Sequence, residues 1–566
     1  MFLSVLLKNE NPWDLANYHY YNVFAFLNDR SNLDVVPASV NTFFNPIMDL
    51  PLYFYIQYFN DYPNILYALQ GIWGGLFLFM LYKICLLFFT ENNKYALFSL
   101  VLILTVSAQA TFCQIGASTN EIPVSFFILW GLYILLKMIK LPQTQTLKKF
   151  LIAGLIMGMG LGLKQTVITY CVASGLTLMI CYKYLNKPIK SIFVFALSGF
   201  IGYLVINGYF MYKYWVLYGN PFFPFLNGVF HSPYFFDFNY RDTNFIPTLA
   251  EFFIFPFMWN IDPLKISDLV YYDLRLTIYY LIPLVVFLFL SFYKKLKNFY
   301  LEQKPLTMLY VFVFLSILIW MAIFSIMRYI VVIEAIGAVI LVNFFQYYNK
   351  SKHKYLFATH ILLIAGLTLS VFLYPNWGHF YGKHIELQEI VLPKNTLVKI
   401  YGMPTAFVIP QLAKKNFVKT VSYYPKCTDT KIQCINGKGA DFAEYGLFLE
   451  KRNKIEKEHL GPVIYIYNEK HFNVFKTKEQ LKEDYQTKLK LCQRAVSLGW
   501  IKNIKKCISE HLKQYLYDME IAENYILDED VALNYDCEKL KNNLFQKLRI
   551  CVPKELKTQI LGKGNE

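Results

Sequence analysis

The sequence predicts an all-α polytopic membrane bundle followed by a smaller α+β extracytoplasmic domain. Composition is the first reason: 56% of the 566 residues are hydrophobic and 17% are charged, whereas soluble proteins hold about 25% charged residues. Long apolar runs recur up to residue 374 and then stop, and lysines gather in alternate loops between them. We therefore expect a transmembrane domain over residues 1–374 and a soluble domain over residues 375–566.

The apolar runs are candidate membrane spans, because about 20 apolar residues cross a ~30 Å hydrocarbon core as a helix. A helix also satisfies its own backbone N–H and C=O groups inside hydrocarbon. The expected spans are residues 66–89, 96–113, 124–138, 151–163, 166–182, 192–211, 277–293, 306–325, 330–345 and 356–374.

Charge in the connecting loops predicts their sides. The basic loops contain Lys94; Lys137, Lys140, Lys148 and Lys149; Lys183, Lys187 and Lys190; Lys294, Lys295, Lys297 and Lys304; and Lys350, Lys352 and Lys354. The positive-inside rule makes these loops cytoplasmic. The other loops and the C-terminal domain then lie on the outer side of the inner (plasma) membrane. In a cell with two membranes this side is the periplasm. The net charge of +16 follows from this topology and a basic tail, and no nucleic-acid fold signature accompanies it.

The N-terminus is the exception to this pattern. Residues Met1–Leu7 are apolar but too short to span a membrane, and they lack the basic flank of a signal peptide. If the first loop is outside, a shortened first helix is the expected reading. A short tail that already lies outside is the alternative.

The C-terminal domain holds six cysteines: Cys427, Cys434, Cys492, Cys507, Cys537 and Cys551. An even number outside the membrane predicts three disulfides. We choose the pairs 427–434, 492–507 and 537–551 from fifteen possible connectivities; reduced thiols in a cytoplasmic tail are the alternative. Strands are expected at residues 397–401, 417–423 and 463–467, and helices at 482–498 and 531–548.

The first outside loop is rich in groups that bind sugars. Over a dozen positions it carries Asp14, Asn17, Tyr18, His19, Tyr21 and Asn22. Amide, hydroxyl and aromatic groups together can hydrogen-bond and stack on a sugar ring. Helix capping is the structural alternative for Asp14. Asp34, Asn45 and Asp49 follow, and a structural part is the stronger reading for each.

Glu121 lies in the second outside loop, directly before an apolar run that begins near Pro123. A carboxylate at that position stabilises a helix N-terminus, which is its structural alternative. The topology also places Glu121 on the same side of the membrane as Asp14. Two carboxylates on one side can serve as a general base and a second acidic group.

Three basic residues on the same side are candidates for binding a phosphate. The run 151–163 is about 20 Å long as a helix, and Lys164 ends it; a lysine at that depth faces protein or water, or snorkels to the interface. Arg241 lies in the long outside loop and Arg328 opens the run 330–345. Arginine makes bidentate phosphate contacts. An ion pair of Arg328 with Glu334 is the structural alternative, although the i,i+6 spacing does not favour it.

With these residues in hand, the chain resembles the GT-C superfamily of polytopic glycosyltransferases, which take sugars from polyprenyl-phosphate carriers. The matching segments, in chain order, are Trp13-Asp14 with Asn17-Tyr18-His19, Glu121-Ile122-Pro123, Gly162-Leu163-Lys164, Gly219-Asn220-Pro221 to Pro224, and Arg328-Tyr329. The resemblance covers most of residues 9–345. It departs from the family in lacking a full first helix, and the tail matches no family domain known to us.

The resemblance implies an inverting sugar transfer on the outer face of the membrane. It maps the family's catalytic carboxylate onto Asp14, with Glu121 as the second acidic group. Asn17, Tyr18, His19 and Asp34 would contact substrate, and Lys164, Arg241 and Arg328 would stabilise the departing lipid phosphate. It implies no metal and no cofactor. The partners would be a polyprenyl-phosphate-linked sugar donor, membrane lipid, and an acceptor that is a glycan, a lipid or a protein.

Two other functions remain open from the sequence. A transporter or flippase for a lipid-linked or polar substrate would use broken helices such as the one at Lys164, although no repeat relates the two halves. A non-catalytic envelope scaffold would use the cysteine-bearing tail to bind a partner.

Overall fold

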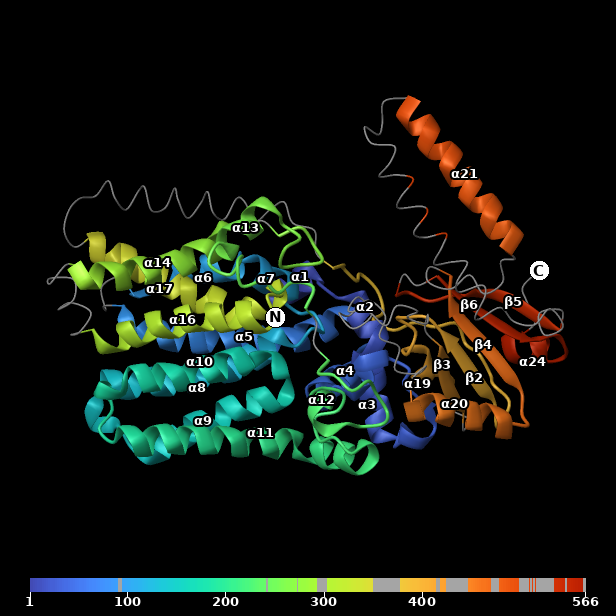
Figure 1. Ribbon diagram of the computed structural model, residues 1–566, viewed down its shortest axis with the longest axis horizontal. Helices are drawn as coiled ribbons and strands as arrows, with labels where there is room; N and C mark the ends of the chain where they lie inside the picture. Colours follow the sequence, from blue (N-terminus) through green and yellow to red (C-terminus); the bar gives the residue numbers. More distant parts are fainter. Residues whose placement is uncertain are drawn as a thin grey trace. The chain divides into compact units, whose positions relative to one another are not determined.

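The computed structural model describes residues 1–89, 94–240, 243–271, 273–292, 303–349, 377–413, 418–423, 446–469, 478–497, 508, 512, 515, 534–544 and 547–562. The chain forms two compact units (Figure 1). Unit 1 comprises Met1–Pro12, Asn45–Phe223 and Arg241–His384, and unit 2 comprises Trp13–Phe44, Pro224–Tyr240 and Ile385–Glu566. Residues Trp13–Phe44 of the segment predicted as the first outside loop thus belong with the C-terminal residues, whereas the sequence predicted a single division at residue 374.

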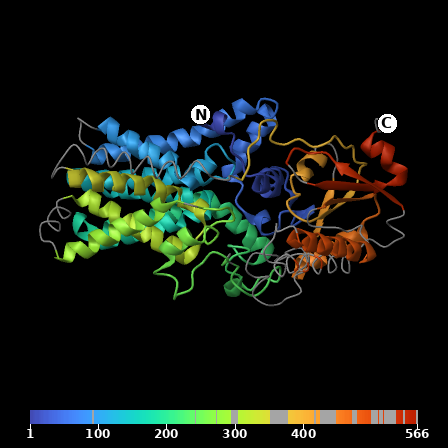
Figure 2. The same ribbon diagram turned by 90° about the horizontal axis from the view of Figure 1, so that it is seen from above.

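Unit 1 is helical, and its long helices run alongside one another in both views (Figures 1 and 2). Its helices are α1 (Phe2–Leu7), α4 (Leu50–Phe59), α5 (Pro63–Phe88), α6 (Lys94–Val106), α7 (Gln109–Gln114), α8 (Glu121–Lys140), α9 (Leu147–Leu163), α10 (Ile168–Ile180), α11 (Pro188–Tyr218), α13 (Phe255–Ile261), α14 (Leu274–Phe292), α16 (Lys304–Ile323) and α17 (Val331–Asn349).

Five helices in the described part of the chain are long and apolar enough to cross a membrane. They are Pro63–Cys85, Glu121–Lys140, Pro188–Tyr218, Lys304–Ile323 and Met327–Phe345. Shorter apolar helices cover Lys94–Val106, Gln165–Ile180 and Leu274–Leu288. The predicted helical bundle is confirmed, and these helices have the length and composition that crossing a membrane requires. The expected span 356–374 lies outside the described residues.

The expected single span 96–113 is wrong, because the chain breaks after α6 and restarts as α7. Two carboxylates accept hydrogen bonds from the backbone N–H groups at the start of α7, which have no partner within the helix. Glu334 accepts from the N–H groups of Ala110 and Thr111 at 3.0 and 2.8 Å, and Asp273 accepts from Gln109 at 3.4 Å. Hydropathy cannot reveal this break, since the residues that stabilise it come from other helices.

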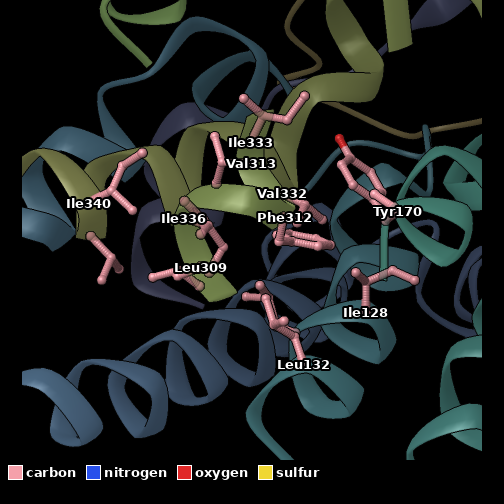
Figure 3. Close-up of a cluster of buried hydrophobic side chains, with 14 of the residues drawn as sticks. Ile128, Leu132, Tyr170, Leu309, Phe312, Val313, Val332, Ile333, Ile336 and Ile340 are labelled. Carbon is pink, nitrogen blue, oxygen red and sulfur yellow. The ribbon is translucent and has the colours of Figure 1, made fainter. Parts of the chain in front are cut away.

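The interior of unit 1 is a cluster of interleaved apolar side chains (Figure 3). Tyr170 of α10, Phe312 of α16, Ile128 of α8 and Ile336 of α17 are buried within it. A second close contact joins α9 to α11 through glycines. A Cβ atom added at Gly158 would lie 1.9 Å from the carbonyl oxygen of Gly199, so the two backbones touch, and glycine at these positions allows this close approach.

The N-terminal segment is built into unit 1. Ser4 of α1 occupies the space beside Gly71 of α5 and Gly116. After α1 the backbone pairs with the residues before His384: the N–H of Glu10 donates to the carbonyl of Gly378 at 3.0 Å. The apolar start of the chain is thus a six-residue helix held against α5.

Unit 2 contains a six-stranded mixed sheet in the order β1-β3-β2-β4-β6-β5. The strands are β1 (Asp34–Val35), β2 (Leu397–Tyr401), β3 (Lys419–Tyr423), β4 (Val463–Asn468), β5 (Tyr535–Leu540) and β6 (Leu548–Pro553). The pairs β1–β3, β3–β2 and β2–β4 are parallel, and the pairs β4–β6 and β6–β5 are antiparallel. The strands expected in the C-terminal domain are confirmed, and β1 is contributed by the first outside loop.

Unit 2 also contains α-helices in its described residues. They are α3 (Tyr20–Leu27), α12 (Asn227–Phe230), α19 (Val408–Leu412), α20 (Gly446–Glu458), α21 (Lys478–Ser497) and α24 (Lys557–Leu561). α20 packs on one face of the sheet, where the Arg452 guanidinium lies 4.3 Å from the ring centroid of Tyr423. α21 confirms the helix expected at 482–498.

The helix expected at 531–548 is wrong, because Tyr535–Leu540 forms β5 and pairs with β6. Cys537 lies opposite Cys551 in this ladder, and the two form the predicted disulfide. The cross-link and the ladder override a local pattern rich in helix-forming residues. Cys492 is also disulfide-bonded, whereas Cys427, Cys434 and Cys507 lie outside the described residues, so the other two pairings stay predictions.

Candidate functional site

The structure brings two predicted site residues of unit 1 together. The Lys164 ammonium lies 2.5 Å from the Glu121 carboxylate and also donates to the carbonyl of Thr119. Glu121 is buried, while the Lys164 side chain is 19% exposed. Glu121 Oε2 has no hydrogen-bond partner among the described residues. The pair therefore has one unused carboxylate oxygen and a cation that solvent or a ligand can reach.

Local backbone geometry places both groups at helix ends. Lys164 is extended, at φ −152°, between the end of α9 and the 3-10 turn Gln165–Val167. Glu121 is the first residue of α8 and follows Asn120, which adopts a left-handed conformation at φ +68°. The predicted break at Lys164 is confirmed, and ion pairing replaces snorkelling as the account of this lysine.

Arg328 joins the same network through two side chains. Thr119 donates its hydroxyl to Gln114 Oε1 at 2.8 Å, and Gln114 Nε2 donates to the carbonyl of Arg328 at 2.9 Å. The Arg328 guanidinium lies 5.3 Å from the ring centroid of Tyr329. Lys164 and the Arg328 turn are thus connected by hydrogen bonds through Thr119 and Gln114. We call Glu121, Lys164, Thr119, Gln114 and Arg328 the cationic centre.

Two amide groups beside the cationic centre were missed from the sequence. Asn120 donates to the buried carboxylate of Asp49. Asn207 of α11 accepts from Asn45 at 3.1 Å, and Asn45 also donates to the carbonyl of Gly162. Asn45 and Asp49 have the structural parts expected of them. A polar residue inside the apolar run 192–211 was the available signal for Asn207.

Arg328 does not pair with Glu334, which caps α7 instead. A second charged network surrounds this carboxylate in unit 1. Arg275 forms an ion pair with Asp273 at 2.6 Å and donates to Ser107 at 2.8 Å. Sequence reasoning missed the network, although an Asp and an Arg two residues apart directly before an apolar run were a signal.

The first outside loop forms a helical segment of unit 2 that changes type along its length. Pro12–Asp14 is α-helical, Leu15–His19 is a π-helix, and α3 continues from Tyr20. Asp14, Asn17, Tyr18 and His19 are all buried. The Tyr18 ring lies 4.1 Å from the ring of His19. π-Helical turns are rare and occur frequently at functional sites.

Asp34 is occupied by partners within unit 2. Arg30 binds both of its carboxylate oxygens, at 2.9 and 2.6 Å, and the Tyr21 hydroxyl donates to it at 2.8 Å. The same guanidinium donates to the carbonyl of Val418. These bonds hold β1 in the sheet, which is the structural part expected of Asp34, and its contact with a substrate stays a prediction.

Asp14, Asn17, Tyr18, His19 and Asp34 belong to unit 2, whereas Glu121, Lys164 and Arg328 belong to unit 1. Arg241 lies outside the described residues. Within the described part of the chain, no group of three or more His, Cys, Asp and Glu side chains is arranged to hold a metal ion. Comparisons with protein-family models, with curated proteins and with solved structures gave no match.

Proposed function

We propose that this protein is a membrane glycosyltransferase that moves a sugar from a polyprenyl-phosphate carrier to an acceptor hydroxyl outside the membrane. The observation that supports the proposal best is the cationic centre of unit 1. A lysine between two apolar helices is energetically costly and suggests a functional site, and the backbone carbonyl of Arg328 belongs to the same hydrogen-bonded network. A lysine and an arginine whose backbone belongs to the same hydrogen-bonded network suit a phosphate attached to a lipid chain.

The proposed reaction is an inverting displacement. The acceptor oxygen attacks the anomeric carbon opposite the phosphate, the bond from that carbon to the phosphate oxygen breaks, and the lipid phosphate leaves with the bonding electrons. Asp14 takes the proton of the attacking hydroxyl. Lys164 and Arg328 stabilise the negative charge that develops on the phosphate, and Glu121 fixes the position of the Lys164 ammonium.

The donor and the side of the membrane follow from this assignment. The donor is a lipid-linked sugar that reaches the protein from the bilayer, as five apolar helices allow. A disulfide between β5 and β6 suits an extracytoplasmic unit 2, because disulfides persist in oxidising compartments. We therefore place the reaction on the outer side of the cell inner (plasma) membrane.

Substitution of Lys164 tests the proposal. Purified protein in lipid vesicles is supplied with a synthetic polyprenyl-phosphate sugar labelled in the sugar, drawn from a panel of hexoses and pentoses, and with membrane extract as acceptor. We expect Lys164→Ala to slow transfer of label about 10²–10³-fold, the usual effect of removing one such group. Lys148→Ala, at an exposed position of α9, is the matched control and should transfer as the parent does.

Loss of folding must be separated from loss of chemistry, because Lys164→Ala leaves Glu121 buried without its cation. The double variant Glu121→Gln/Lys164→Gln removes both charges and keeps hydrogen-bonding groups, and its thermal unfolding midpoint should stay near that of the parent. A well-folded double variant with full transfer activity would contradict the assignment.

A transporter or flippase is the second candidate, and a specific observation favours it. Asp273, Arg275 and Glu334 form a buried charged network beside the break between α6 and α7, and the proposed transfer does not use it. Buried charges and broken helices are common in transporters. Movement of labelled lipid-linked sugar across vesicles without transfer to any acceptor, abolished in Arg275→Met, would favour this candidate.

A further inference from the structure

The parallel part of the unit 2 sheet has a topological switch point. β2 is followed along the chain by β3 on one side, and the next strand, β4, pairs on the other side of β2. In open sheets with parallel strands, ligands bind outside the carboxyl ends of the strands where the order reverses in this way. Here the carboxyl ends of β2 and β4 are Tyr401 and Asn468.

The segment after β2 is buried and hydrogen-bonded at this edge. The Thr405 hydroxyl donates to the carbonyl of Gly402 at 2.7 Å, and the Asn468 amide donates to the carbonyl of Met403 at 3.4 Å. Gly402 has a positive φ of 80°, which lets the chain turn sharply out of β2. The turn therefore holds uncharged polar groups in a fixed arrangement at the switch point.

The helical segment that carries Asp14 docks on this turn. The Phe407 N–H donates to the carbonyl of Ala16 at 3.0 Å, and the amide of Gln411 in α19 donates to the Tyr20 hydroxyl at 3.0 Å. All of these residues belong to unit 2. The buried polar groups of residues 14–19 and the turn after β2 thus form one continuous edge, which we call the carboxyl edge.

Asn17, the residue after Ala16 in the docked segment, supplies an independent sign of a ligand. Its side chain is 0% exposed, and neither Nδ2 nor Oδ1 has a hydrogen-bond partner among the described residues. Leaving a buried amide unsatisfied costs about 1–3 kcal/mol. Asn22, five residues further along, is partly satisfied: its Nδ2 donates to the carbonyls of Asn41 and Phe44, while its Oδ1 has no partner among the described residues.

We propose that the carboxyl edge of unit 2 binds an uncharged, polyhydroxylated ligand through Asn17, and that this ligand is the sugar acceptor. A side-chain amide both donates and accepts, which matches a hydroxyl group that does the same. The polar groups of the turn, Thr405 and Asn468, are uncharged, which suits hydroxyls better than phosphate. The naming of the ligand as acceptor rests on the proposed function; the binding of a carbohydrate does not.

The test combines ligand binding with stability on the full chain in detergent, without donor lipid. The probes are the methyl glycosides of glucose, galactose, mannose, N-acetylglucosamine and N-acetylgalactosamine, and binding is read by saturation-transfer NMR. We expect the parent protein to bind at least one of them. Asn17→Ala should bind that glycoside about tenfold more weakly, the effect of losing one or two hydrogen bonds.

Stability separates a binding role from a structural one. Because the Asn17 amide has no protein partner, Asn17→Ala should keep or raise the thermal unfolding midpoint. Asn22→Ala, which removes two hydrogen bonds to backbone carbonyls, should lower it. Two results overturn the proposal: no glycoside binds the parent, or Asn17→Ala binds as the parent does. If glycosides bind through Asn17 and no sugar is ever transferred, the proposed function fails and this site stands.

Discussion

Two candidate site residues of unit 1, Glu121 and Lys164, are partners although they lie more than forty positions apart in the sequence. Glu121 and Lys164 were chosen separately, as a carboxylate before one apolar run and a lysine after another, and they form one ion pair. Asp34 was also predicted as a site residue from its type and position, but it forms an ion pair with Arg30, four residues earlier. Residue type and position therefore identified polar side chains of interest, while the pairing of Glu121 with Lys164 depends on a tertiary contact that a single sequence does not display.

Glu10 provides a pH-dependent prediction at the residue scale. Its buried carboxylate accepts from the Ser118 hydroxyl at 2.6 Å and lies 3.5 Å from His384. Burial raises the pKa of Glu10, but the contacts with His384 and Ser118 together lower it below its ordinary value of 4.5. A carboxyl group whose pKa is lower in the folded protein than in the unfolded chain stabilises the fold at pH values above its unfolded pKa. This stabilisation is lost as the pH falls through the lowered pKa.

The expected outcome is a smaller acid sensitivity in Glu10→Gln. Between about pH 6 and pH 3.5, the thermal unfolding midpoint of unit 1 should fall more in the parent than in the variant. Glu450→Gln, at an exposed position of α20, serves as control and should follow the parent. Equal acid sensitivity of parent and Glu10→Gln would show that this carboxylate does not stabilise the fold.

At the scale of elements, periodicity and hydropathy located most helices and strands but not the contacts that interrupt them. β2 and the start of β4 coincide with the β-rich runs. The break before α7 and the strand β5 were missed, because carboxylates from other helices and a cross-strand disulfide stabilise them. Both depend on partners more than a few residues away, which local patterns do not contain.

The close contact of α9 with α11 predicts that adding one methyl group at Gly158 destabilises the protein. Gly158→Ala would place a Cβ atom against the Gly199 carbonyl, so the helices must move apart and we expect a loss of about 1–3 kcal/mol. Gly175→Ala in α10 is the control, because nothing lies within 4 Å of its Cβ position. It should gain about 0.5–1 kcal/mol. Thermal unfolding of the two variants in one detergent measures the difference, and an equally stable Gly158→Ala would contradict the close packing.

At the scale of the whole molecule, the sequence predicted a helical membrane part and a mixed C-terminal part, and both are present. The sequence did not reveal that residues Trp13–Phe44 belong to unit 2. The reason is physical: the two-residue strand β1 is too short to show a pattern of its own, and its pairing with β3 joins positions almost four hundred residues apart.

Sidedness is the prediction for the whole molecule. In intact cells, a membrane-impermeant maleimide should label a cysteine introduced as Lys554→Cys in unit 2 and should not reach Lys148→Cys in the first turn of α9. Both positions are exposed, so access depends on the membrane. Permeabilised cells should label both, and the parent protein gives the background from its own cysteines. Labelling of Lys148→Cys alone in intact cells would reverse the proposed orientation.

The most direct test of sugar transfer is a comparison of the parent with Asp14→Asn. Both are reconstituted in vesicles with labelled polyprenyl-phosphate sugar, and product is measured together with the thermal unfolding midpoint. The parent should release polyprenyl phosphate and move label to the acceptor. Asp14→Asn should fold normally and lose about 10²–10⁴-fold in rate, as expected when a general base is removed. Full transfer by a folded Asp14→Asn would contradict the mechanism.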